Sequence, residues 1–118
     1  MSSKENAAVF QLFEKLECRY ALRVLWALRD GHPQTFRLLQ DSVGGITPNT
    51  LNTRIKELRE AGFLDHGSDG YRLTTQGADL ARRMVDVQQF AGRWAQQQAR
   101  AAMAVATSAS APAAAHAP

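Results

Sequence analysis

Between positions 47 and 56 the chain carries short polar and basic side chains that could read the edges of base pairs. Asparagine can form two hydrogen bonds with adenine, threonine can bond to a base or touch a thymine methyl group, and arginine can fork onto guanine. A polar helix face is also typical of an ordinary solvated helix, so the interpretation depends on the elements that present it. The residues expected to reach bases or their flanking phosphates are Thr47, Asn49, Thr50, Asn52, Thr53 and Arg54, and those expected to hold the phosphate backbone are Lys56, Arg37 and Arg72.

Most of these side chains belong to a predicted helix over about 47–61. Thr47 can accept a backbone N–H as N-cap, and Pro48 suits the first helical position because no hydrogen bond is lost there. Gly62 ends the helix. Its large apolar residues form one narrow stripe, Leu51, Ile55 and Leu58. The opposite face is therefore left for solvent or a ligand.

Three further helices are predicted before this one. Apolar residues at helical spacing indicate amphipathic helices over 4–17 and 19–30 and a short helix over 36–43. Gly44 and Gly45 end the short helix and supply a tight turn. Residues 34 and 35 form either a very short strand or a turn.

A hairpin and a long helix follow. Segments 63–66 and 70–74 alternate in polarity and are joined by residues 67–69, and Thr74 or Thr75 then caps the last helix. Two short helices around a glycine turn, followed by a hairpin, predict a mainly α fold with a small β-hairpin: a winged helix-turn-helix whose wing spans 63–74.

The wing contains one basic candidate, Arg72. Strand alternation turns Tyr71 and Leu73 inward and Arg72 outward, where it could meet a phosphate or the minor groove, although a generic exposed arginine fits the pattern equally well. His66 and Ser68 are weaker candidates. The acidic residues Asp65 and Asp69 would repel phosphate unless they point away.

The first and last helices carry more large apolar side chains than a domain of about 90 residues can shelter. In the last helix they follow the spacing of a coiled-coil seam. We expect a homodimer interface here, the alternative being that both helices fold back onto the core of their own monomer. Its predicted residues are Val9, Leu12, Phe13, Leu16, Met84, Val87, Phe90 and Trp94.

Composition narrows the class of protein. The chain has 118 residues and a net charge of +3, enough for one domain, predicted over 1–98. Residues 99–118 are rich in alanine and form a low-complexity tail, either a disordered linker or a frayed helical extension. No apolar run is long enough to span a membrane, and the N-terminal residues do not resemble a signal peptide, so we expect a cytoplasmic protein. Residues 18–62 hold seven basic and four acidic residues, so the positive charge gathers around the helix-turn-helix.

Catalysis has no support in the sequence. His32, His66 and His116 are scattered and lack the spacing of metal ligands, and no glycine-rich phosphate loop occurs. Ser42 and Cys18 have no recognisable neighbouring base. We expect neither an enzyme nor a metal or cofactor.

The chain resembles the HxlR-type winged helix-turn-helix transcriptional regulators, relatives of the MarR-like group, over residues 18–83. That family has an Arg-Phe-x-Glu-Leu box, a Gly-Ile-Ser turn, a recognition helix and a Leu-Thr-x-x-Gly motif after the wing. The resemblance implies a homodimer built from the first and last helices, with two recognition helices in successive major grooves. The residues that correspond to these motifs are Thr35, Phe36, Arg37, Leu38 and Leu39; Gly45, Ile46 and Thr47; Leu51, Arg54, Ile55, Lys56, Glu57, Leu58 and Gly62; and Leu73, Thr74, Thr75, Gln76 and Gly77.

The sequence departs from the family pattern at four places. Residues 19–21, Arg-Tyr-Ala, replace the family's Gly-Lys-Trp, and Leu38 replaces the glutamate of the box. The wing is several residues shorter than usual. Cys18 does not align with the family cysteine, so redox or electrophile sensing is not carried over, and a half-buried structural thiol is expected instead.

These patterns predict a dimeric, bacterial-type transcriptional regulator that binds double-stranded DNA. One alternative is a winged-helix adaptor that binds protein and never touches DNA, which Glu57, Glu60 and the two wing aspartates favour. A further alternative is that the space between the helices of the dimer binds a small effector, for which the sequence offers no polar anchor.

Overall fold

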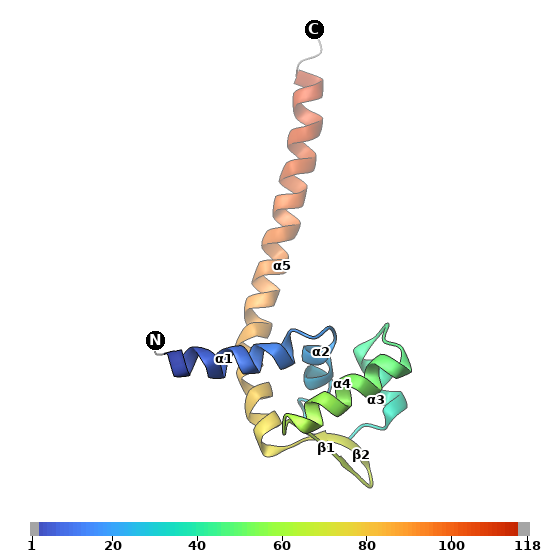
Figure 1. Ribbon diagram of the computed structural model, residues 1–118. Helices are drawn as coiled ribbons and strands as arrows, with labels where there is room; N and C mark the ends of the chain where they lie inside the picture. Colours follow the sequence, from blue (N-terminus) through green and yellow to red (C-terminus); the bar gives the residue numbers. More distant parts are fainter. Residues whose placement is uncertain (1–2, 116–118) are drawn as a thin grey trace. The chain divides into compact units, whose positions relative to one another are not determined.

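A computed structural model describes the backbone of residues 3–115 and the side chains of residues 3–108. The chain divides into two compact units, Met1–Arg83 and Met84–Pro118. Figure 1 shows the order of the elements along the chain. They are α1 (Ser3–Leu16), α2 (Ala21–Ala27), α3 (Phe36–Val43), α4 (Pro48–Glu60), β1 (Leu64–Gly67), β2 (Gly70–Leu73) and α5 (Thr75–Ala115).

The core of the first unit lies where α2 packs against α3 and α4. All three residues of the predicted stripe on α4 are buried, with Leu51 completely enclosed. Burial of this one face fixes the rotation of α4 about its axis, because turning the helix would expose the stripe to water. The largest fully buried side chains of the chain's described part are Leu25, Leu28, Leu39, Leu51, Leu58 and Val24.

Helix α4 begins and ends where its capping residues predict. The side chain of Thr47 accepts the N–H of Thr50 at 3.3 Å, and Pro48 occupies the first turn. Gly62 follows the helix with a φ of +86°, a left-handed conformation that favours glycine. Both boundaries are local properties of the sequence.

Helix α2 is shorter than predicted, and the expectation of a helix over 19–30 is wrong at both ends. Tyr20 has a φ of 78°, so regular helix cannot begin before Ala21. At the other end the N–H groups of Leu28 and Arg29 bond to carbonyls three residues back, which tightens the chain into turns after Ala27.

The hairpin is antiparallel, with Leu64 opposite Leu73 and Gly67 opposite Gly70. Its connection is two residues long, Ser68 and Asp69, and not three as predicted, because Gly67 belongs to β1. A single bridge joins the hairpin to the chain before α3, with backbone bonds of 2.9 and 2.8 Å between Gln34 and Tyr71. The predicted short strand is therefore this one bridge.

Thr74, and not Thr75, caps α5. Its hydroxyl oxygen accepts the N–H of Gly77 at 3.0 Å and donates to the carbonyl of Gly62 at 2.6 Å. Gly77 is needed because a Cβ there would collide with the carbonyl oxygen of Phe63. These bonds join the end of α4 to the start of α5 within the first unit.

Helix α5 continues past residue 98 as far as Ala115. The predicted tail is therefore helical through most of its length, and its last residues, 116–118, lie outside the described part. The division between domain and tail at residue 98 stays a prediction, since no break in secondary structure marks it.

Candidate nucleic-acid interface

The polar face of α4 lies outside the core. Asn49, Asn52 and Thr53 are exposed, as are Thr47 and Lys56. Within residues 3–108 the two asparagine amides make no hydrogen bond, so their donors and acceptors are free for a ligand. The structure therefore presents most of the predicted reading residues together on one helix face.

Three threonines on this face are partly engaged within the helix. The hydroxyl of Thr47 donates to that of Thr50 at 2.9 Å, and the hydroxyl of Thr53 donates to the carbonyl of Asn49 at 3.0 Å. Each hydroxyl oxygen has two lone pairs and each threonine keeps a methyl group. These residues can accept a hydrogen bond or make an apolar contact without breaking the helix.

Arg54 is in a different position from the other predicted contacts. Its guanidinium forms an ion pair of 2.9 Å with Glu57, and its side chain is only 19% exposed. Its Nε atom is buried without a hydrogen-bond partner. Glu57 therefore already pairs with this arginine, and base contact by Arg54 stays a prediction.

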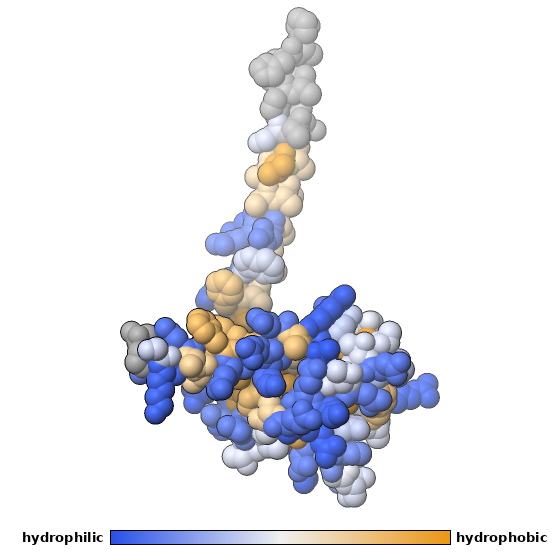
Figure 2. Space-filling model, in the orientation of Figure 1, coloured by the Kyte–Doolittle hydropathy of each residue, from blue (hydrophilic) through white to orange (hydrophobic). Residues whose placement is uncertain are grey.

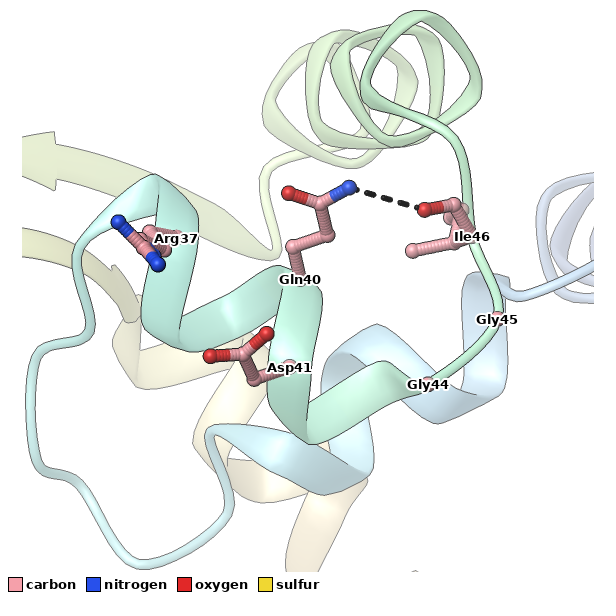
Figure 3. Close-up of a pocket in the computed structure, with 6 residues that line it drawn as sticks. All are labelled: Arg37, Gln40, Asp41, Gly44, Gly45 and Ile46. Carbon is pink, nitrogen blue, oxygen red and sulfur yellow. Dashed lines mark hydrogen bonds between the residues drawn. The ribbon is translucent and has the colours of Figure 1, made fainter.

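The turn between α3 and α4 lines an open pocket of about 640 Å³ with Arg37 near one edge. Figure 3 shows Gln40 reaching across to the turn, where its amide donates to the carbonyl of Ile46 at 3.1 Å. Gly44 and Gly45 both have positive φ, 76° and 67°, which makes the turn tight enough to bring α4 back beside α3. The exposed Arg37 lines the same pocket as the turn that leads into α4.

A second groove, of about 610 Å³, lies between α4 and the hairpin. Lys56 and Asn52 border it, as does Arg59, an exposed cation that the sequence analysis did not select. Helical spacing could have identified Arg59, because it lies three residues after Lys56 on the same face. Glu60 and Asp65 also line the groove and reduce its positive charge.

The hairpin presents its side chains as alternation predicts. Tyr71 and Leu73 are partly buried, and Arg72 is exposed opposite Asp65. The Tyr71 ring stacks on His66 with centroids 4.1 Å apart and an interplanar angle of 10°. Arg72 is thus outward, although its nearest cross-strand neighbour is acidic.

Tyr20 is a structural contact that sequence reasoning missed. Its hydroxyl donates to the carbonyl of Gly45 at 3.2 Å, across 25 positions of the chain. The Arg19 and Arg23 guanidiniums lie 4.8 and 5.7 Å from the centre of its ring. No periodicity or cap signals a left-handed tyrosine, so this bond could not be read from the sequence.

The apolar residues of the two terminal helices remain largely uncovered in a single chain. In α1, Val9 and Phe13 are 37% and 49% exposed, and in the second unit Phe90 and Trp94 are 60% and 52% exposed. Figure 2 shows apolar atoms at the surface of α1 between charged ones. Leu12, Leu16 and Met84 are intermediate in exposure.

Other types of site find little support in the part of the chain described. Residues 3–108 contain no cluster of three His, Cys, Asp or Glu side chains that could hold a metal ion. None of the described helices combines the length and hydrophobicity that a bilayer crossing requires. Cys18 is half-buried, and its thiol donates to the carbonyl of Glu14 at 3.4 Å.

The HxlR-like helix-turn-helix family matches residues 15–99. The chain belongs to this family. Membership supports a DNA-binding transcriptional regulator and not an enzyme, in agreement with the exposed polar face of α4.

Two solved structures resemble this chain. One is a possible HxlR family transcriptional factor from Thermoplasma volcanium GSS1, with a TM-score of 0.66 and 24% identity over 72% of this chain and 82% of that one. The other is quinone-bound YodB from B. subtilis, with a TM-score of 0.62 and 25% identity over 77% of this chain and 98% of that one. No curated protein matches by sequence. The winged helix-turn-helix fold predicted from the residues is confirmed.

Proposed function

We propose that this HxlR-like protein regulates transcription as a homodimer that places α4 of each protomer in the major groove. The observation that carries the proposal is the division of α4 into two faces. Leu51, Ile55 and Leu58 are buried, whereas Asn49 and Asn52 stand free on the exposed side. A helix with this division, in a family of helix-turn-helix proteins, is suited to base readout.

Basic side chains beside α4 supply the sequence-independent part of the binding. Four of them are exposed in each protomer: Arg37, Lys56, Arg59 and Arg72. If each neutralises one phosphate, eight contacts per dimer give a slope of log affinity against log salt of about −7. Affinity then falls about 10⁴-fold between 50 and 200 mM salt.

The experiment is titration of labelled genomic DNA fragments with purified protein at several salt concentrations. The fragment that binds most tightly is taken as the operator. Its affinity for the wild type is then compared with its affinity for the variant Asn49→Ala/Asn52→Ala. Loss of one asparagine–adenine pair costs about 1–3 kcal/mol, or roughly 5- to 150-fold in affinity for the operator. Asn6→Ala, which removes the chain's third asparagine, is the matched control and leaves the affinity unchanged.

A protein-binding adaptor is the competing function, favoured by the acidic residues Glu60 and Asp65 beside the groove between α4 and the hairpin. A salt slope near zero for the wild type, with a protein partner lost in the double asparagine variant, would replace the DNA proposal with the adaptor.

The dimer is proposed from the exposed apolar residues of α1 and α5. Large uncovered aromatic side chains such as Phe90 are expected to be buried against a second copy. Phe90→Lys should convert the dimer to a monomer in analytical ultracentrifugation. Met103→Lys, at an apolar residue that is 71% exposed and lies outside the predicted interface, should leave the dimer intact. A wild-type protein that sediments as a monomer contradicts the proposal.

A small effector is the last element of the proposal, supported by the quinone bound to YodB. Addition of benzoquinone should shift the melting temperature of the protein and weaken its binding to the operator. An unchanged melting temperature and unchanged operator affinity contradict this element alone.

A further inference from the structure

The start of α2 is joined to the turn that precedes α4 by one side chain, Tyr20. Tyr20 is the one non-glycine residue with positive φ in the described chain, at 78°. Its hydroxyl donates to the carbonyl of Gly45, two residues before the N-cap Thr47. The tyrosine ring therefore lies next to the end of α4 that enters the major groove in the proposed function.

Two arginines lie against this ring. The guanidinium carbons of Arg19 and Arg23 are 4.8 and 5.7 Å from its centroid. Stacking on an aromatic ring restrains a long side chain while its N–H donors stay available at the edge. Both arginines are exposed, and neither forms an ion pair with any carboxylate of residues 3–108. Two restrained and unneutralised cations thus lie together beside the turn.

Their place complements the basic residues already assigned. Lys56 and Arg59 border the groove between α4 and the hairpin, so these two cations flank the C-terminal part of α4. Arg37 lines the pocket at the turn before α4, and Arg72 lies on β2. Arg19 and Arg23 add two further cations next to the chain that leads into the N-terminus of α4, on the side of the turn that Tyr20 contacts. A helix inserted in the major groove has a phosphate backbone on each side of it, so cations on both flanks of the helix can contact phosphates.

We propose that Arg19 and Arg23 bind DNA phosphates beside the N-terminal end of α4, with Tyr20 as the residue that positions them. The inference rests on the proposed function and names the phosphate backbone as the partner of this cluster. It adds about two phosphate contacts per bound protomer to the four counted above. Contacts of this kind hold the register of the protein on DNA and carry no sequence preference.

The test compares salt dependence of DNA binding for the full chain and three variants. Arg19→Ala/Arg23→Ala should reduce the slope of log affinity against log salt by about 1.8 per bound protomer. The factor by which affinity falls between 50 and 200 mM salt should then be about 12 times smaller for each bound protomer. Arg19→Lys/Arg23→Lys keeps both charges and should retain most of the slope.

Arg29→Ala is the matched control. Arg29 is also stacked on an aromatic ring, 4.2 Å from the centre of Trp26, but it follows the other end of α2. Its removal should leave the slope at the wild-type value. A merely structural role for Arg19 and Arg23 would lower thermal stability without moving the slope.

The outcomes separate the two proposals. A wild-type slope near zero contradicts DNA binding itself. A wild-type slope clearly different from zero, with the same slope in the double alanine variant and in Arg29→Ala, overturns the phosphate contact alone. Should the double variant not fold, Arg19→Ala and Arg23→Ala are measured singly, and a slope reduced by about 0.9 in each supports the contact, whereas no change in either overturns it.

Discussion

Replacement of Thr74 by valine should destabilise the winged domain far more than the same change one residue later. The Thr74 hydroxyl bonds in two directions: it accepts the N–H of Gly77 at 3.0 Å and donates to the carbonyl of Gly62 at 2.6 Å. Valine has nearly the same shape, so packing is preserved and only these two hydrogen bonds are lost.

The magnitude follows from the two bonds. Loss of an N-cap costs about 1 kcal/mol. The carbonyl of Gly62 is left without its short hydroxyl donor in a partly buried place, which costs a further 1–3 kcal/mol or so. The free energy of unfolding should therefore fall by about 2–4 kcal/mol.

Urea denaturation followed by far-UV circular dichroism measures this difference. Thr75→Val is the matched control, since Thr75 is exposed and its side chain makes no hydrogen bond within the described residues. Thr74→Ser keeps both bonds, so its free energy of unfolding should lie much closer to that of the wild type than that of Thr74→Val does. Equal unfolding free energies for Thr74→Val and Thr75→Val would refute the reasoning.

Three other predictions concern the same unit. Gly70→Ala places a Cβ 2.5 Å from the carbonyl oxygen of Gln34 at a φ of +127°, so it should lower the melting temperature and expose the hairpin to proteolysis; an unchanged cleavage rate contradicts this. Tyr20→Phe removes the bond to Gly45 and should cost about 0.5–1.5 kcal/mol in urea titrations while the salt slope of DNA binding stays constant. The hydrogen bond from Arg82 lowers the pKa of Asp79 in the folded protein. The ionised Asp79 therefore stabilises the fold at pH values above its pKa in the unfolded chain, and this stabilisation is lost as the pH falls through its pKa in the folded protein. Asp79→Asn should therefore have a lower free energy of unfolding than the wild type at pH 7, and the two should converge at the acidic end of the titration.

The ends of α4 could be predicted because their determinants are local. Thr47, Pro48 and Gly62 act through their own backbone and their immediate neighbours, so residue type and order are sufficient. The buried face could also be predicted, because apolar residues at helical spacing form a single stripe and that stripe faces the core. Sequence reasoning thus predicted both the extent of α4 and the face that it buries.

The ends of α2 could not be predicted in this way. The predicted helix starts at Arg19, and nothing in the residue types indicates that Tyr20 leaves the helical region. Its conformation accompanies a hydrogen bond to Gly45, a residue 25 positions away. The ion pair of Arg54 with Glu57 could have been predicted from the i,i+3 spacing of the two residues, and base contact by Arg54 stays a prediction.

Local signals define the length of α4, whereas two hydroxyl groups from outside the helix hold the chain on either side of it. Before α4, Tyr20 donates to the carbonyl of Gly45, and after α4, Thr74 donates to the carbonyl of Gly62. Each bond spans at least 12 positions and fixes a backbone carbonyl two residues or fewer from the capping residue of α4. In the proposed function α4 must keep its side chains within a fraction of an ångström of their partners, so anchors at both ends would serve recognition as well as stability. A variant lacking both hydroxyls should therefore discriminate the operator from other DNA less well than either single variant, even where folding is complete.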